Sequence, residues 1–302
     1  MENIFTEINR RFNAGSILTK YIYINAGVFI AIRLLIILMR LFMADASFLE
    51  YIQMPSSWQL LLYRPWTIFT YMFVHIDFLH ILFNMLWLYW FGKIFLMFFN
   101  GRQMGGLYVL GGVAGGLLFI LSYNIFPFLG QFSANTFLVG ASASIMAIVF
   151  AVSFYQKDYT INLLLLGRVK LIYLAIGVLL LDIIAITSEN TGGHIAHIGG
   201  SLLGILFAGQ YRKGRDITNF MNRLIDQFVN FITHKPSFKV YRKKVGKNRP
   251  TKSHHAETDD EYRRRKNEEN RMIDEILDKL KRSGYGSLTT DEKKKLFDAS
   301  RK

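Results

Sequence analysis

Apolar residues in this chain are gathered into long blocks separated by short polar stretches, and they do not alternate with polar residues as in a half-buried strand. Six such blocks cover residues 21–43, 73–98, 105–125, 138–155, 170–187 and 194–211. A helix needs about 20 mostly apolar residues to cross roughly 30 Å of hydrocarbon. The pattern therefore predicts an all-α, polytopic membrane protein with six membrane spans.

The first block is the least regular of the six, because it contains Arg33 near its centre. On insertion scales, an arginine in the middle of a membrane costs about 3 kcal/mol. We therefore expect Arg33 to face the helix bundle or to reach towards the membrane boundary.

Basic residues near the block ends predict the orientation, because Lys and Arg are enriched in cytoplasmic loops. One set of loops holds Arg64 together with three acidic residues, Asp45, Glu50 and Glu189. The opposite set holds Arg10, Arg11, Lys20, Lys93, Arg102, Lys157, Arg168 and Lys170, and the basic tail follows the sixth block. Both termini are thus expected in the cytoplasm. The same charges favour a bacterial cytoplasmic membrane. The N-terminus lacks a signal-peptide pattern, so we expect internal spans to direct insertion.

Composition and charge narrow the possible partners. The chain has 302 residues, of which 51% are hydrophobic, and no cysteine, which excludes disulfides and thiolate metal sites. From residue 211 onwards there are 25 Lys and Arg against 14 Asp and Glu. Because this basic tail directly follows a membrane span, anionic lipid is the expected partner, and nucleic acid is not.

The tail changes character along its length and divides the chain into four parts. We expect a cytoplasmic segment at 1–20, the six-span domain at 21–211, a basic juxtamembrane segment and linker at 212–256, and a helical hairpin at 257–302. An apolar stripe of Met272, Ile273, Ile276, Leu277 and Leu280 predicts the first hairpin helix, with Gly284 as its C-cap. Thr289 and Glu292 have capping-box spacing and predict the start of a second helix, bearing Leu296 and Phe297. The hairpin is expected to be a docking or regulatory module, and its partner is unknown.

Polar and ionisable side chains within the apolar blocks are candidates for function, because they are expensive at membrane depth. They are His75, His80, Asn84, Ser142, Ser144, Asp182, His194 and His197. His194 and His197 could ligate a metal, but no third ligand has diagnostic spacing. Asp182 has no second carboxylate with which to form an aspartyl protease site. We therefore expect neither a metal nor another cofactor.

Ser142 is the best candidate for a nucleophile. It begins the fourth block, where the free backbone N–H groups of a helix N-terminus favour developing negative charge. His197 lies at the same end of the sixth block and could act as the general base. His80 and Asn84 are four residues apart, hence on one face of the second block, and could bind an oxyanion. Three helices thus bring four polar residues to one depth.

Small residues around Ser142 favour this arrangement. Gly140 and Gly200, with Gly204 one turn further, would let the fourth and sixth blocks approach closely. Ser144 points about 200° away from Ser142 on a helix, so only one of the two serines can face His197. We expect Ser144 to be a packing residue.

The same residues resemble the motifs of the rhomboid family of intramembrane serine proteases. The matching stretches are "GAS" at 140–142, "AHIGG" at 196–200 and "HILFN" at 80–84, with "RPWTIFTYMFVH" at 64–75. The resemblance covers roughly residues 15–211. It implies a six-helix rhomboid bundle and a Ser142–His197 dyad, with an oxyanion hole of His80, Asn84 and the Ser142 backbone N–H. It also implies transmembrane proteins as substrates, a first loop partly in the membrane, and the fifth span as a substrate gate.

Three residues depart from the family pattern. Trp66 is followed by Thr67 where the family often has arginine, and the arginine comes earlier, as Arg64. Ala143 replaces a glycine, and Met146 stands where an aromatic ring often stacks on the histidine. These departures remove no chemical role, so we expect activity. The alternatives are a catalytically silent rhomboid-like protein that binds and routes transmembrane helices, and a transporter or channel.

Overall fold

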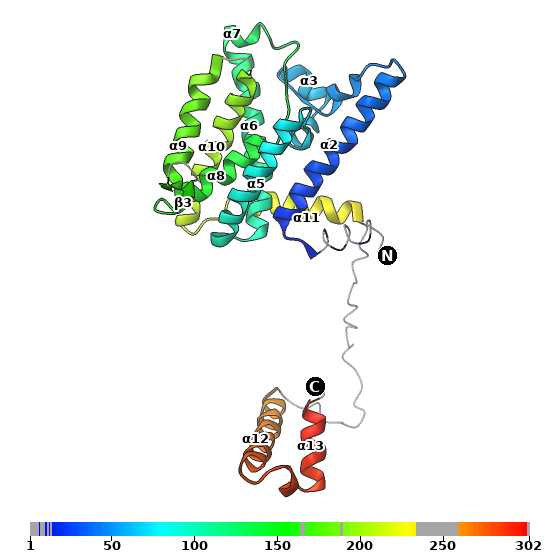
Figure 1. Ribbon diagram of the computed structural model, residues 1–302, viewed down its shortest axis with the longest axis vertical. Coiled ribbons are helices and arrows are strands. Elements are labelled where there is room, and N and C mark those ends of the chain that lie inside the picture. Colours follow the sequence, from blue (N-terminus) through cyan, green and yellow to red (C-terminus); the bar gives the residue numbers. More distant parts are fainter. Residues whose placement is uncertain are drawn as a thin grey trace, which may run out of the picture. The chain divides into compact units, whose positions relative to one another are not determined.

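The computed structural model describes residues 6, 10, 12, 14–163, 167–187, 190–233 and 259–300. The chain forms two compact units, residues 1–236 and 237–302. In the first unit the helices pack side by side as a bundle (Figure 1). The main ones are α2 (Ile17–Leu41), α5 (Phe78–Phe98), α6 (Gly101–Ile125), α8 (Ser142–Tyr155), α9 (Leu171–Ile184) and α10 (Thr191–Arg212). The predicted all-α, polytopic membrane fold is confirmed.

The six helices differ in length. By length and composition, α2, α5, α6 and α10 are long enough to cross a membrane, whereas α8 and the segment from α9 to Thr187 are shorter apolar helices. The 14 residues of α8 cover only about 21 Å at 1.5 Å per residue. Residues 143–153 of α8 are all buried, which makes it the central helix of the bundle.

Helices α8 and α10 pack with their backbones in contact, as the glycine pattern predicts. A Cβ atom on Gly200 would collide with the carbonyl oxygen of Ala143, and one on Gly204 would collide with that of Ala147. Larger residues would therefore push α10 away from α8. This contact places the first turn of α8 against the N-terminal part of α10, where His197 lies.

The chain between α2 and α5 is a folded loop whose elements are short. It contains η1 (Ser47–Tyr51), α3 (Trp58–Tyr63), α4 (Thr67–Thr70) and η2 (Tyr71–Phe73), and β1 (Met54–Pro55) pairs antiparallel with β2 (Phe137–Leu138). The block predicted over 73–98 was therefore too long at its start. Phe73 and Val74 are apolar because they pack against helix α2 of the bundle, and α5 begins only after its N-cap Asp77.

Arg64 and Trp66 both anchor this loop, although their order departs from the family pattern. Arg64 Nη1 donates to the Glu50 carbonyl over 2.8 Å, and its guanidinium stacks on the Tyr51 ring at 4.1 Å. Trp66 Nε1 donates to the Tyr51 carbonyl over 2.7 Å. Arg33 reaches the same region from α2, where its Nη1 donates to the carbonyl of Ile76 over 3.3 Å.

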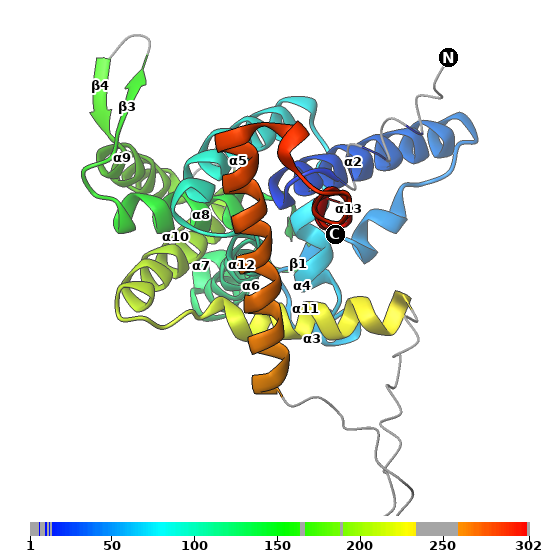
Figure 2. The ribbon, with the colours of Figure 1, turned by 90° about the horizontal axis from the view of Figure 1, so that it is seen from below.

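The opposite end of the bundle carries the basic residues. There β3 (Thr160–Leu163) and β4 (Gly167–Lys170) form an antiparallel hairpin between α8 and α9, with Lys170 paired to Asp158. Beyond α10, the segment expected as a basic juxtamembrane segment contains a helix, α11 (Thr218–Thr233), which lies crosswise to the bundle (Figures 1 and 2). The sequence analysis did not predict α11, because it weighed the net charge of the tail and overlooked the 3.6-residue period of apolar residues in this segment. The short helix α7 (Pro127–Gly130) and η3 (Ala185–Thr187) lie at the other end.

The second unit is the expected helical hairpin, formed by α12 (Asp259–Ser283), η4 (Tyr285–Ser287) and α13 (Thr290–Ser300). The predicted capping box is confirmed, because Thr289 N donates to Glu292 Oε2 over 2.7 Å and Glu292 N donates to Thr289 Oγ1 over 3.3 Å. Gly284 ends α12 with a φ of 73°. Of the predicted stripe, Ile276 is buried, whereas Met272 and Leu277 stay exposed. The predicted linker core at 235–256 and the Phe297 side chain lie outside the described part.

Candidate functional site

A cavity of about 540 Å³ lies among α5, α8 and α10. The four residues expected to converge there, Ser142, His197, His80 and Asn84, all line it. Their neighbours in the lining are Asp77, Leu79, Phe83, Trp87, Phe137, Leu138, Val139, Ile145, Met146, Asn190 and Gly193. The cavity is thus apolar in its walls and polar where the three helices meet. A mostly apolar pocket with a few convergent polar groups is typical of a ligand-binding or active site.

The turn before Ser142 requires glycine at Gly140 for two reasons. Its φ of 110° lies in the left-handed region, and a Cβ there would stand 2.7 Å from Nε2 of His80. The turn is fixed to the folded loop because Gly140 N donates to the Tyr71 carbonyl over 2.9 Å. Ser142 then begins α8, where the first N–H groups have no partner within the helix.

His197 is held by an acidic residue from the neighbouring helix. Its Nδ1 lies 2.9 Å from Oδ1 of Asp182, which is on α9 and is 5% exposed. The Nδ1 of His194 lies 2.8 Å from the same oxygen. One carboxylate oxygen therefore joins both histidines of the "HIAH" segment and links α9 to α10.

The sequence analysis did not foresee the contact between Asp182 and His197. From the sequence, Asp182 was considered only as one half of an aspartyl protease site, and His197 was given no acidic partner. The available signal was an acidic residue alone in an apolar block, which marks a functional site by default but does not name its partner. Two residues of the "HIAH" segment and one of α9 meet only through the fold.

His75 makes contacts that its position in the sequence did not indicate. It is fully buried, and its Nε2 lies 3.3 Å from Asn84 Nδ2 and 3.4 Å from the backbone N of Ala141. Its ring packs edge-on against His80, with centroids 5.1 Å apart. A side-chain amide has two N–H groups, so His75 can hold one while the other stays free. His75 thereby ties α5 to the turn that carries Ser142.

Ser144 and Met146 lie on different sides of α8. Ser144 is fully buried and does not line the cavity, and its Cα would lie 3.3 Å from a Cβ on Gly111 of α6. This packing position is the one expected for it. Met146 does line the cavity beside Ser142 and His197, in place of an aromatic ring.

Among the described residues, one group offers three possible metal ligands. These are Asp182, His194 and His197, whose possible ligand atoms lie within 4.8 Å of one another. Helix α9 therefore supplies, through Asp182, the third ligand that the sequence spacing did not indicate. Nitrogen and carboxylate ligands suit zinc. The two Nδ1 atoms are nevertheless at hydrogen-bonding distance from Oδ1, and hydrogen bonding accounts for the arrangement without an ion.

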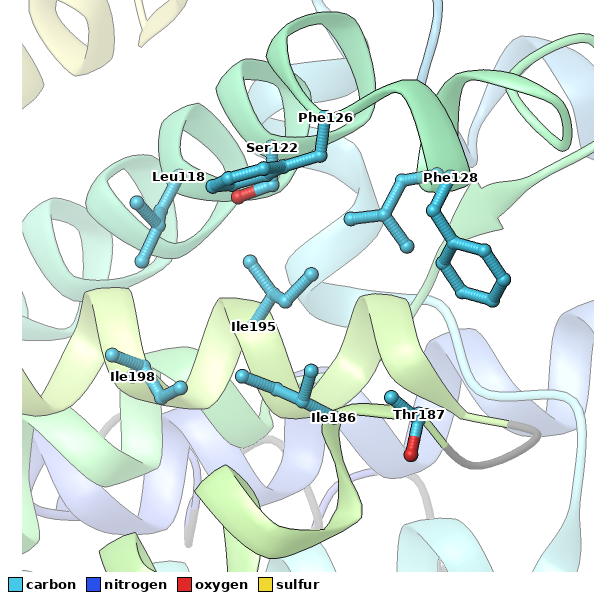
Figure 3. Close-up of a pocket in the computed structure, with 9 residues that line it drawn as sticks. Leu118, Ser122, Phe126, Phe128, Ile186, Thr187, Ile195 and Ile198 are labelled. Carbon is cyan, nitrogen blue, oxygen red and sulfur yellow. The ribbon is translucent and has the colours of Figure 1, made fainter.

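A second cavity, of about 370 Å³, lies on the other side of α10 (Figure 3). Its walls come from α6, α7, η3 and α10, and nearly all of them are apolar. Ser122 and Thr187 are its only polar side chains, and no ionisable group among the described residues lines it. It therefore offers neither a base nor an acid, and the first cavity remains the candidate functional site.

Comparisons with known proteins agree with this fold and these motifs. A family model for the rhomboid domain matches residues 63–213. A family of unknown function (DUF6576) matches residues 256–302, which include the hairpin. The chain is 28% identical over 161 residues to "RHOMBOID-like protein 12, mitochondrial" from Arabidopsis thaliana. That match covers 50% of this chain and 48% of the relative, so the chain spans about half the length of the curated relative it matches.

Proposed function

The chain belongs to the rhomboid family of integral membrane proteins, and we propose that it is a serine endopeptidase that cleaves transmembrane helices within or near the bilayer. One observation carries the proposal. His197, which shares a cavity with Ser142, is held through Nδ1 by the buried carboxylate of Asp182. A residue that merely packed helices together would not need its ring oriented in this way.

The hydrogen bond to Asp182 defines the tautomer of His197. A carboxylate only accepts, so Nδ1 carries the hydrogen and donates it. In the neutral ring Nε2 then keeps its lone pair and can act as the general base on the cavity side. Ser142 Oγ passes its proton to Nε2 as it attacks the carbonyl carbon of the substrate. His197 then donates this proton to the leaving amine, and water hydrolyses the acyl-enzyme by the same two steps.

The negative charge on the tetrahedral intermediate needs donors, and three are close to Ser142. They are the unpaired N–H groups of the first turn of α8, the free N–H of Asn84, and His80. His75 acts through Asn84, because it holds the other N–H of that amide. We therefore assign His75 to positioning and Asn84 to oxyanion binding.

Asp182 extends the dyad of the family to a third residue in this chain. Its negative charge stabilises the imidazolium that forms when His197 takes the proton. His194 donates to the same oxygen and gives α9 a second contact with α10. Asp182 does not line the cavity, so it is a positioning residue that acts through His197.

The proposal extends to the class of substrate and to the membrane in which the protein lies. We propose single-span proteins whose helix can unwind near small residues, because a helical backbone hides its own carbonyl groups in hydrogen bonds. We propose the bacterial cytoplasmic membrane with both termini in the cytoplasm, in accord with the basic residues at one end of the bundle. Anionic lipid remains the proposed partner of the basic tail, and the partner of the hairpin is unknown.

A fluorophosphonate probe together with a single-span substrate tests the proposal. The purified full chain should be labelled and should cleave the substrate, whereas Ser142→Ala and His197→Ala should do neither. Ser144→Ala is the matched control and should behave like wild type. Wild-type protein that neither labels nor cleaves, yet retains the substrate on a column, would instead support a silent protein that binds transmembrane helices.

A further inference from the structure

Helix α11 has one face fixed to the bundle. Thr218 and Asn222 are buried against α6, where a Cβ on Gly106 would lie 2.8 Å from Thr218 Cβ and from Asn222 Oδ1. Asp226, further along the helix, is ion-paired with Arg102 in the first turn of α6. The position of α11 on the bundle is therefore set by polar and steric contacts.

A second face of α11 is apolar, and the described residues of the first unit leave it exposed. Phe220, Leu224, Phe228 and Phe231 fall within about 80° of one another at 100° per residue. Their exposed fractions are 67%, 42%, 65% and 78%. Large apolar side chains gathered in one exposed stripe mark an interaction surface. A separate polar arc of similar width holds Asn219, Arg223, Gln227 and Asn230.

The level of α11 relative to the membrane helices indicates what this stripe contacts. Only residues 213–217 separate α11 from the end of α10, and α11 packs beside the start of α6. Both are ends of helices that are long and apolar enough to span a membrane. Figures 1 and 2 show α11 lying across these ends. Lys213 and Arg215 are exposed in the connecting turn, as expected where a membrane meets the cytoplasm.

We propose that α11 is an interfacial helix whose stripe of Phe220, Leu224, Phe228 and Phe231 inserts into the lipid leaflet at the basic end of the bundle. A helix that lies crosswise at the ends of membrane-spanning helices is next to the boundary between lipid headgroups and acyl chains. Helices that lie in this boundary carry Phe and Leu on one face and polar or basic residues on another, as α11 does. The proposal needs only that the chain spans a membrane and is independent of its catalytic activity.

Single-cysteine labelling can test this proposal directly, because the natural chain contains no cysteine. Phe228→Cys and Phe231→Cys place an environment-sensitive NBD label on the apolar stripe, and Asn230→Cys places one on the polar arc as the matched control. The full chain is reconstituted in nanodiscs of phosphatidylcholine with some phosphatidylglycerol, where both leaflets are accessible. Quenching is measured with aqueous iodide and with lipid that carries a nitroxide high on the acyl chain. The melting temperature of each variant checks its fold.

The labels at positions 228 and 231 should emit at shorter wavelength than the label at 230. They should show a several-fold lower iodide quenching constant and strong quenching by the nitroxide lipid. Equal iodide quenching at all three positions would overturn the proposal, because the stripe would then face water. Protection from iodide without quenching by the lipid would also overturn it, since a second copy or the C-terminal unit would then cover the stripe.

Discussion

Replacing Asp182 by asparagine separates its charge from its geometry. Oδ1 of Asp182 accepts from both histidines, at 2.8 and 2.9 Å, whereas Oδ2 is buried without a hydrogen-bond partner. An asparagine can therefore keep its oxygen in the Oδ1 position and put its NH₂ in the place of Oδ2. Both histidines would keep their acceptor, and only the negative charge would be lost. Asp182→Ala removes the charge and the acceptor together.

The two variants should differ in magnitude. Hydrogen bonds to charged groups contribute about 1.5–3 kcal/mol, and each 1.36 kcal/mol changes a rate about tenfold. Because the charge matters most when His197 is protonated, Asp182→Asn should lower kcat by about 10- to 150-fold. Asp182→Ala also frees the His197 ring, so its kcat should fall further, by about 10³-fold or more.

Substrate cleavage in lipid nanodiscs gives kcat and KM separately, and the rate of fluorophosphonate labelling reports the nucleophile without a protein substrate. KM should stay unchanged in both variants, because Asp182 is 5% exposed and does not line the cavity. His194→Ala is the matched control. It removes the other donor to the same oxygen but leaves the bond to His197, so its kcat should stay close to that of wild type.

The reasoning would be refuted by an Asp182→Ala variant that keeps the wild-type kcat and labelling rate while His197→Ala is inactive. Packing alone would then orient His197, and Asp182 would serve only to join α9 to α10. A loss of activity that merely follows a lower melting temperature would indicate the same structural role. Activity that falls at an unchanged melting temperature supports positioning.

Three further predictions concern other parts of the chain. Gly140→Ala should abolish labelling of Ser142, because the new Cβ would lie 2.7 Å from His80 Nε2 on a backbone with a φ of 110°. The backbone strain should cost about 1–3 kcal/mol. A variant that is still labelled would contradict this prediction. Gly200→Ala should lower the melting temperature through overpacking of about 1–3 kcal/mol, whereas Gly209→Ala, with no atom within 4 Å of the new Cβ, should not. Hydrogen bonds from the backbone of Thr289 and from a lysine hold the pKa of Glu292 below its usual value. The stabilisation of α13 by Glu292 should therefore be complete above about pH 4.3 and be lost as the pH falls through that lowered pKa. Hydrogen exchange of the α13 amides in the full chain, compared with Glu292→Gln, measures this loss.

The long spans could be predicted from the sequence because the density of apolar residues is a local property. The same density misled at the start of α5. Phe73 and Val74 belong to a loop that folds back into the bundle, and a buried loop has the same composition as a buried helix. Helix α11 was missed for the opposite reason, because the charge of the tail concealed an apolar period of 3.6 residues.

The candidate site shows a similar division. Helix direction alone brings the outer ends of α8 and α10 together, so the shared cavity of Ser142 and His197 could be predicted from topology. No such rule indicates which side chain of α9 reaches α10, because the number of residues between Asp182 and His197 does not determine whether they are in contact. The contacts of Asp182 and of His75 are tertiary, and only the packed structure reveals them.

The shortness of α8 would place the proposed nucleophile, Ser142, below the surface of the hydrocarbon layer and still within reach of water. Its 14 residues cover about 21 Å, whereas the hydrocarbon layer is about 30 Å thick. If Tyr155 ends the helix at the basic boundary, Ser142 lies roughly 9 Å below the other boundary by this difference. The chain must then descend to that depth as an irregular segment, which is tolerated only where protein or water surrounds it. The turn at Gly140 meets this condition, because it bonds to the Tyr71 carbonyl and faces the cavity that holds His80. A short central helix would therefore account for both the depth of the proposed nucleophile and its access to water.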